Sequence, residues 1–199
     1  MDTHRLSAIL LIAGFAVLMV ASLFGPQGIY QTADPAERVQ IIEEDLNGWN
    51  ITQSLTGLAI LLTAVGFAVL ASRLRTMGNA WVPILGAAAL VVGAISGALF
   101  LYRQTTDPLN AFEGAYSGMQ TLYYWLTLAG LLLFGVSFLG SSLPAWLGYV
   151  TAGTALVYGI VYLVTGEGFL TPFLVSLLSL VIAIILLRQS NVQPANRTE

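Results

Sequence analysis

The chain has 199 residues, of which 57% are hydrophobic and only 9% are charged, and its formal net charge is -3. In soluble domains about a quarter of all residues are charged. This composition therefore excludes a soluble fold and indicates that lipid surrounds much of the surface. Cysteine and lysine are absent and His4 is the only histidine. These absences exclude disulfides, thiolate metal sites, Schiff bases and haem ligation within the membrane. We therefore expect no cofactor and no metal, and the chain has no basic surface for nucleic acid.

Six stretches are long enough to cross a hydrocarbon core about 30 Å thick, which takes roughly 20 apolar residues per helix. They lie at about residues 6–24, 51–72, 80–102, 115–140, 144–165 and 169–187. The first stretch follows His4 and Arg5, as in a signal peptide, but its apolar run is long for that role and favours a retained helix. The sequence thus predicts an all-α, polytopic membrane protein with a single transmembrane domain over residues 1–187. The polar segment 188–199 is predicted to be a disordered cytoplasmic tail.

The charged residues outside these stretches set the predicted orientation. With the N-terminus inside, the cytoplasmic side holds most of the arginines, namely Arg5, Arg73, Arg75, Arg188 and Arg197. The outer side then holds Arg38 and Arg103 together with most of the acidic residues, which are Asp34, Glu37, Glu43, Glu44, Asp45, Asp107, Glu113 and Glu167. Because arginine and lysine favour the cytoplasmic side, we predict that both termini lie in the cytoplasm (N-in/C-in).

The first outer loop is predicted to hold a short amphipathic helix over residues 35–47. Asp34 is typical of an N-cap and Pro35 of the first helical position. Val39, Ile42, Leu46 and Trp49 form one apolar stripe on this helix. Its other faces are acidic, whereas helices that lie on anionic membranes favour lysine and arginine. One interpretation is therefore a lid whose stripe rests on the outer mouth of the protein, and the other is a helix that lies at the membrane interface.

Polar side chains follow one face of the second, fourth and fifth predicted spans. Since polar groups in hydrocarbon need partners, these faces should turn inward and form an outward-opening cavity. The candidate lining residues are Trp49, Gln53, Thr56, Tyr116, Gln120, Tyr124, Thr127, Thr154, Tyr158 and Tyr162. Arg103, Glu113 and Glu167 are expected at the rim of this cavity. The alternative is that these residues form only hydrogen bonds between helices and aromatic belts at the membrane interface.

The third predicted span carries a surface of small residues, with Gly86, Gly93 and Gly97 along it. Such a surface allows close contact between helices. We expect it inside the bundle, and the alternative is the interface of a homo-oligomer.

The segment DPAERVQIIEEDLNGW, the later GFAVLASRLR and the still later LPAWLGYVTAG resemble small uncharacterised six-helix membrane proteins of bacteria and archaea. This resemblance implies the six-helix topology and a bacterial or archaeal plasma membrane. It implies no activity and no site residues.

No catalytic set is present, because every ionisable acidic or basic group lies outside the predicted spans. We therefore expect no enzyme. The leading hypothesis is a non-enzymatic membrane protein, either an accessory subunit of another membrane protein or a binder of an apolar or amphipathic ligand. The alternative is a small-solute transporter or channel, whose path hydroxyls and backbone carbonyls could line. A polar route to the Arg73–Arg75 side would favour transport, and a cavity closed on that side would favour binding.

Overall fold

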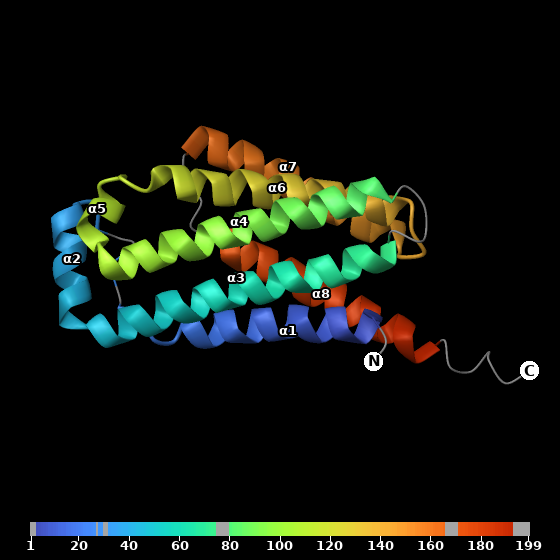
Figure 1. Ribbon diagram of the computed structural model, residues 1–199, viewed down its shortest axis with the longest axis horizontal. Helices are drawn as coiled ribbons and strands as arrows, with labels where there is room; N and C mark the ends of the chain where they lie inside the picture. The colour runs from blue at the N-terminus through green and yellow to red at the C-terminus, as the bar shows by residue number, and fades with distance from the viewer. Residues whose placement is uncertain (1–2, 27, 30–31, 75–79, 166–170, 193–199) are drawn as a thin grey trace, which may run out of the picture.

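The computed structural model describes residues 3–26, 28–29, 32–74, 80–165 and 171–192 of the chain. Every secondary-structure element within these ranges is a helix (Figure 1). In chain order they are α1 (Thr3–Ala21), α2 (Pro35–Glu44), α3 (Leu46–Leu74), α4 (Trp81–Thr106), α5 (Pro108–Phe112), α6 (Ser117–Leu139), α7 (Ala145–Thr165) and α8 (Thr171–Val192). The predicted all-α fold class is confirmed.

Six helices among the described residues, α1, α3, α4, α6, α7 and α8, are long and apolar enough to cross a membrane. They correspond one by one to the six predicted spans, so the chain is a multi-pass membrane protein. The two short helices, α2 and α5, lie together at one end of the bundle, here called the α2–α5 end (Figure 1). The chain termini lie at the opposite end, here called the terminal end. Which end faces the cytoplasm stays a prediction.

The predicted boundaries of the loop helix were wrong at its end. The helix α2 begins at Pro35, after the Asp34 carboxylate accepts a hydrogen bond from the Ala36 N–H. It ends at Glu44, and Asp45 begins a new helix by accepting a hydrogen bond from the Gly48 N–H over 3.0 Å. This is the role of an N-cap side chain. The residues Leu46 and Trp49 therefore belong to α3 and not to the loop helix.

The predicted boundary of the C-terminal tail was also wrong. Residues 188–192 continue α8 instead of beginning the tail. The Gln189 side-chain amide lies 3.4 Å from the Ser142 carbonyl, and Ser190 is buried. The Gln189 contact reaches the α6–α7 turn, and the Ser190 hydroxyl donates to the Leu187 carbonyl within the helix, so α8 continues beyond its apolar run. The rest of the predicted tail, 193–199, lies outside the described residues.

The spanning helices pack in the order α8, α1, α3, α4, α6, α7, each against the next. Their shared core is densest toward the terminal end, where Phe67, Phe134 and Phe138 are completely buried. The ring centroids are 4.8 Å apart for Phe67 and Phe134, and 5.9 Å apart for Phe134 and Phe138. Because lipid is as apolar as these side chains, dispersion contacts rather than the hydrophobic effect hold them together. We call these three residues the phenylalanine plug.

The small-residue face of α4 packs against α6. A Cβ atom added at Gly86 would lie 3.2 Å from the Gly130 carbonyl oxygen, and one at Gly97 would lie 2.8 Å from the Tyr123 ring. Gly93 likewise faces α6, at Leu126. Since α6 covers this face within the chain, these three glycines are not available for the homo-oligomer interface considered above.

Candidate ligand-binding cavity

A cavity of about 280 Å³ lies between α1, α3, α4, α6 and α8, in the half of the bundle nearer the α2–α5 end. Its described lining residues are Leu18, Met19, Ser22, Thr52, Gln53, Thr56, Ile60, Gly97, Phe100, Leu101, Gln104, Gln120, Tyr123, Tyr124, Pro172 and Phe173. None of these is Asp, Glu, Lys, Arg or His. Most of the lining is apolar and a few polar groups converge on it, which is the general character of a small-molecule site.

Four of the candidate lining residues from the sequence meet at this cavity, namely Gln53, Thr56, Gln120 and Tyr124. They come from α3 and α6, which lie on either side of α4 (Figure 1). The Gln120 amide donates a hydrogen bond to the Tyr124 hydroxyl over 2.9 Å, within one turn of α6. Gln53 is only 3% exposed, so its amide lies inside the bundle and faces the cavity rather than the surroundings.

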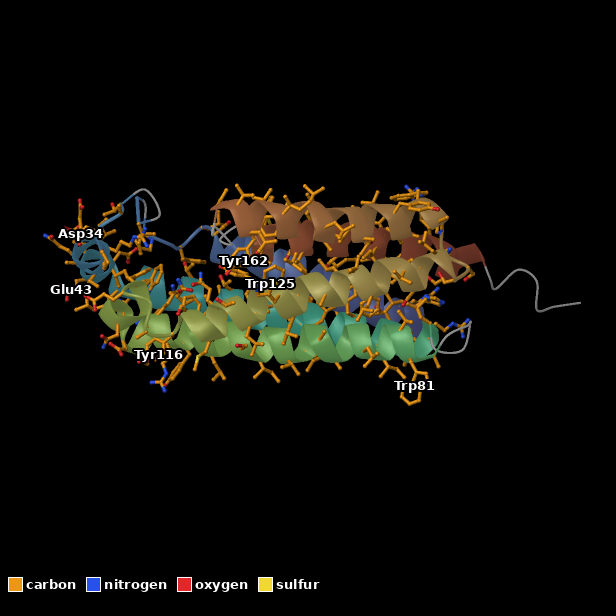
Figure 2. The ribbon with its side chains drawn as sticks, turned by 90° about the horizontal axis from the view of Figure 1, so that it is seen from above. Asp34, Glu43, Trp81, Tyr116, Trp125 and Tyr162 are labelled. Carbon is orange, nitrogen blue, oxygen red and sulfur yellow. The ribbon has the colours of Figure 1, made fainter. Side chains whose placement is uncertain are left out.

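Tyr162 supports the cavity wall from behind and does not line it. Its ring meets the edge of the Tyr124 ring at a centroid distance of 5.0 Å and that of Trp125 at 5.8 Å. Tyr124 in turn lies 5.3 Å from the Tyr123 ring. Figure 2 shows Trp125 and Tyr162 side by side where α6 and α7 meet. The aromatic wall is thus fixed by edge-on ring contacts, each worth about 0.5–1.5 kcal/mol beyond packing area.

The other two candidates from α7, Thr154 and Tyr158, border a separate void of about 10 Å³ between α6, α7 and α8. The reason is the position of α7. Its Gly148 packs directly on α6, where an added Cβ would lie 2.7 Å from the Gly135 carbonyl oxygen. This contact holds α7 on the far side of α6, so α1 and α8 complete the cavity in its place.

Trp49 and Tyr116 are also outside the cavity. The Trp49 indole is buried among Ile29 and Ile42, and its N–H donates to the Gln104 carbonyl over 3.1 Å. The Tyr116 hydroxyl donates to the Asp107 carboxylate over 2.7 Å. Figure 2 shows Tyr116 at the edge of the bundle that lies away from Tyr162. Both aromatic residues therefore fix the connections at the α2–α5 end.

The structure describes two of the three residues that were predicted at the rim of the cavity. Arg103 is exposed and its guanidinium stacks over the Tyr116 ring at 5.3 Å, so it belongs to the outer surface of α4 and α6. Glu113 is exposed in the α5–α6 turn and is not a lining residue. Glu167 lies outside the described residues.

The Asp107–Tyr116 hydrogen bond shifts the acidity of both groups. The hydroxyl of Tyr116, followed by the amide of Asn110, lowers the pKa of Asp107 below its usual value. The same bond raises the pKa of Tyr116, since ionising the phenol beside a carboxylate is unfavourable. At neutral pH the carboxylate therefore stays ionised and the phenol stays protonated. The pair is a fixed hydrogen bond that does not release a proton.

Several lining residues were missed by the sequence analysis. Gly97, Phe100 and Gln104 share one face of α4 at spacings of three and four, but the predicted span ended at residue 102 and left Gln104 in the loop. Tyr123 follows Gln120 by three residues, a helical spacing that could have identified it. The lining residues of α1 and α8 are mostly apolar and show no pattern that separates them from a lipid-facing surface.

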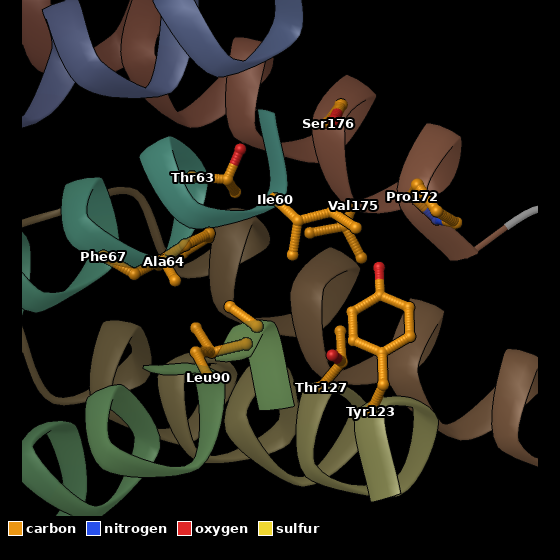
Figure 3. Close-up of a pocket in the computed structure, with 11 residues that line it drawn as sticks. Ile60, Thr63, Ala64, Phe67, Leu90, Tyr123, Thr127, Pro172, Val175 and Ser176 are labelled. Atoms are coloured by element: carbon orange, nitrogen blue, oxygen red, sulfur yellow. The ribbon is translucent and has the colours of Figure 1, made fainter. Parts of the chain in front are cut away.

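A second void of about 20 Å³ lies deeper in the bundle and holds Thr127, the last candidate from α6 (Figure 3). It shares Ile60, Tyr123 and Pro172 with the cavity. Its size is close to the minimum for one water molecule. Phe67, which belongs to the phenylalanine plug, closes the far side of this void, and Phe134 packs against Phe67.

We find no match for this chain among protein-family models, curated proteins or solved structures.

Proposed function

We propose that this protein is a non-enzymatic plasma-membrane protein that binds an apolar or amphipathic molecule in the cavity between α1, α3, α4, α6 and α8. The observation that carries this proposal is the meeting of Gln53, Gln120 and Tyr124 around a space of about 280 Å³ whose wall also holds many apolar side chains and no charged one among the described residues. Drug-sized ligands occupy sites of about 300–1,000 Å³. The ligand is therefore a small molecule, or one end of a longer lipid-like molecule. With the predicted orientation, the cavity lies in the outer half of the membrane.

The phenylalanine plug favours binding over transport. A transported solute must pass from the cavity to the terminal end, and between α3 and α6 completely buried rings oppose such a passage. A channel lined by hydroxyls and carbonyls needs a continuous row of such groups. The small void at Thr63, Thr127 and Ser176 lies next to Phe67 of the plug.

The experiment fills the cavity by mutation. Thr56 is half-buried and lines the cavity, so Thr56→Phe places a ring inside it. Ser54→Phe is the matched control, because Ser54 lies two residues earlier on α3 and is exposed. Each protein is placed in lipid nanodiscs and labelled with decan-1-ol that carries a photoreactive diazirine. Labelled peptides are then identified by mass spectrometry.

Wild-type protein and Ser54→Phe should be labelled on cavity residues such as Met19 and the buried Tyr123, and unlabelled decan-1-ol should compete. Thr56→Phe should lose this labelling while the folded fraction stays unchanged in size-exclusion chromatography. Labelling spread evenly over lipid-facing positions in all three proteins would contradict the proposal.

A further inference from the structure

Two carboxamides in the cavity wall are buried but make no hydrogen bond. Gln53 is 3% exposed and Gln104 is 8% exposed, and both line the cavity. Within the part of the chain that the structure describes, neither side-chain amide has a hydrogen-bonding partner. Neither amide is among the fully enclosed polar atoms without a partner, so both open on the cavity and can bond a molecule placed inside it. Gln120 differs, because its amide is already bonded to Tyr124.

The two carboxamides lie at the same level of the bundle. The Trp49 indole bonds the Gln104 carbonyl from α3 to α4. Gln53 follows Trp49 by four residues, which is about one turn of α3 on the same face. Gln53 and Gln104 therefore lie on adjacent helices about one turn apart, toward the end of the cavity nearer α2 and α5. Deeper in the cavity the apolar side chains of Leu18, Ile60 and Pro172 line the wall together with Tyr123.

The charge of the wall limits what the carboxamides can hold. No acidic or basic side chain is present among the described lining residues. A charged group placed there would lose its water and gain only neutral partners, which is strongly unfavourable at membrane depth. A carboxamide offers both N–H donors and a carbonyl acceptor. Its best partner in this setting is an uncharged group that can also donate and accept.

We propose that the cavity selects amphiphiles with an uncharged head group, a primary amide or an alcohol, held by Gln53 and Gln104, and that it rejects charged amphiphiles of the same chain length. The head lies toward the α2–α5 end and the alkyl chain extends along the apolar wall. This inference rests on the proposed function, since it names the ligand class of the same cavity.

The experiment compares competitors that share one alkyl chain length and differ in their head group. Photoreactive decan-1-ol labels the protein in nanodiscs, and the competitors are decanamide, decan-1-ol, decane, decanesulfonate and decyltrimethylammonium, compared at equal mole fraction in the lipid. The two ionic competitors stay charged at any working pH, so they cannot enter by neutralising themselves. Decanamide and decan-1-ol should compete best, and decane about tenfold less well, because it leaves both amides without partners. The two ionic competitors should be about a hundredfold weaker.

Two variants assign the selectivity to the carboxamides. Gln53→Leu and Gln104→Leu should remove the preference for decanamide over decane, while labelling itself continues and shows that the cavity is intact. The matched control is Gln40→Leu, which makes the same change at an exposed position of α2. This control should keep the wild-type preference.

The outcomes separate this inference from the proposed function. If an ionic competitor is as effective as decanamide, or if the preference survives in both leucine variants, the uncharged-head inference is wrong and the binding function stands. If no competitor reduces labelling at the cavity residues, the proposed function itself is wrong.

Discussion

The indole N–H of Trp49 donates a hydrogen bond to the backbone carbonyl of Gln104 over 3.1 Å, across 55 residues of sequence. One side of Trp49 packs against Ile42 of α2 and the tilted ring of Phe112 in α5. Its other partner, Gln104, contributes its side chain to the cavity. A single buried tryptophan therefore links the docking of α2 to one of the two amides proposed to hold the ligand.

The first prediction concerns this docking. Ile42 is 1% exposed, whereas Leu46, which the sequence placed on the same stripe, is 49% exposed in α3. Replacing Ile42 by serine should release α2, with a loss of about 2–3 kcal/mol of local stability. Hydrogen exchange of the α2 amides should rise while the spanning helices stay protected. Leu46→Ser is the matched control and should leave exchange in α2 unchanged, and equal exchange in both variants would mean that α2 is not docked through Ile42.

A second prediction tests the hydrogen bond between Gln120 and Tyr124. Gln120→Leu, Tyr124→Phe and the double variant form a thermodynamic cycle. Hydrogen bonds inside membrane bundles are worth about 0.6 kcal/mol on average, and at most about 1.7 kcal/mol. We expect a coupling in this range when unfolding is measured in mixed micelles. A cycle in which the two single effects simply add would show that the bond does not contribute to stability.

The third prediction is a pH dependence at the Asp107–Tyr116 pair. The lowered pKa of Asp107 gives stability that is present above the ordinary carboxyl pKa and lost as the pH falls through the lowered value. The raised pKa of Tyr116 gives stability that is present below the ordinary phenol pKa and lost as the pH rises through the raised value. The bond should therefore persist from about pH 4 to about pH 10.

Ultraviolet titration of the tyrosines checks this assignment. In Asp107→Asn one tyrosine should ionise at lower pH than in the wild type, because the carboxylate that opposes its ionisation is gone. Asp34→Asn is the control, since Asp34 caps α2 through a backbone N–H and should leave every tyrosine unchanged. A titration curve that is the same in Asp107→Asn and the wild type would contradict the assignment.

The fourth prediction concerns orientation in the membrane. The chain has no cysteine, so single cysteines can be introduced at exposed positions near the two ends. Glu43 and Leu109 mark the α2–α5 end, and Ser72 and Ala145 mark the terminal end. A membrane-impermeant maleimide should label the first pair in intact cells and the second pair only after permeabilisation. The reverse pattern would place the cavity in the cytoplasmic half.

The sequence was sufficient for the six spans, which depend on the length of apolar runs, and for part of the cavity, which depends on helical spacing. Gln53, Thr56, Gln120 and Tyr124 stand out as polar residues at helical spacing in apolar surroundings, and they do meet. The same reasoning failed for Tyr158, whose stripe is equally regular. Where Tyr158 lies relative to the cavity depends on which helix α7 packs against. The close contact between Gly135 and Gly148 decides this packing. Periodicity within a single sequence does not reveal which two helices come into contact through such glycines.

The end of the loop helix shows a second limit. An apolar stripe that runs from Val39 to Trp49 predicts one continuous helix, but Asp45 ends one helix and caps the next. A change in helix direction at one residue turns Leu46 away from the protein and leaves Ile42 and Trp49 in contact. Periodicity cannot detect this change, because the spacing of the apolar residues on each side stays helical.

The packing of α8 against α1 has a consequence for biosynthesis. The other neighbouring pairs, α1 with α3, α3 with α4, α4 with α6 and α6 with α7, join helices that leave the ribosome one after another. The α1–α8 pair joins the first helix to the last. Until α8 has inserted, the cavity lacks Pro172 and Phe173 and its wall is incomplete. A ligand in this cavity would therefore stabilise chains in which α8 has inserted, so its presence during membrane insertion would favour survival of these chains over chains that stop before α8.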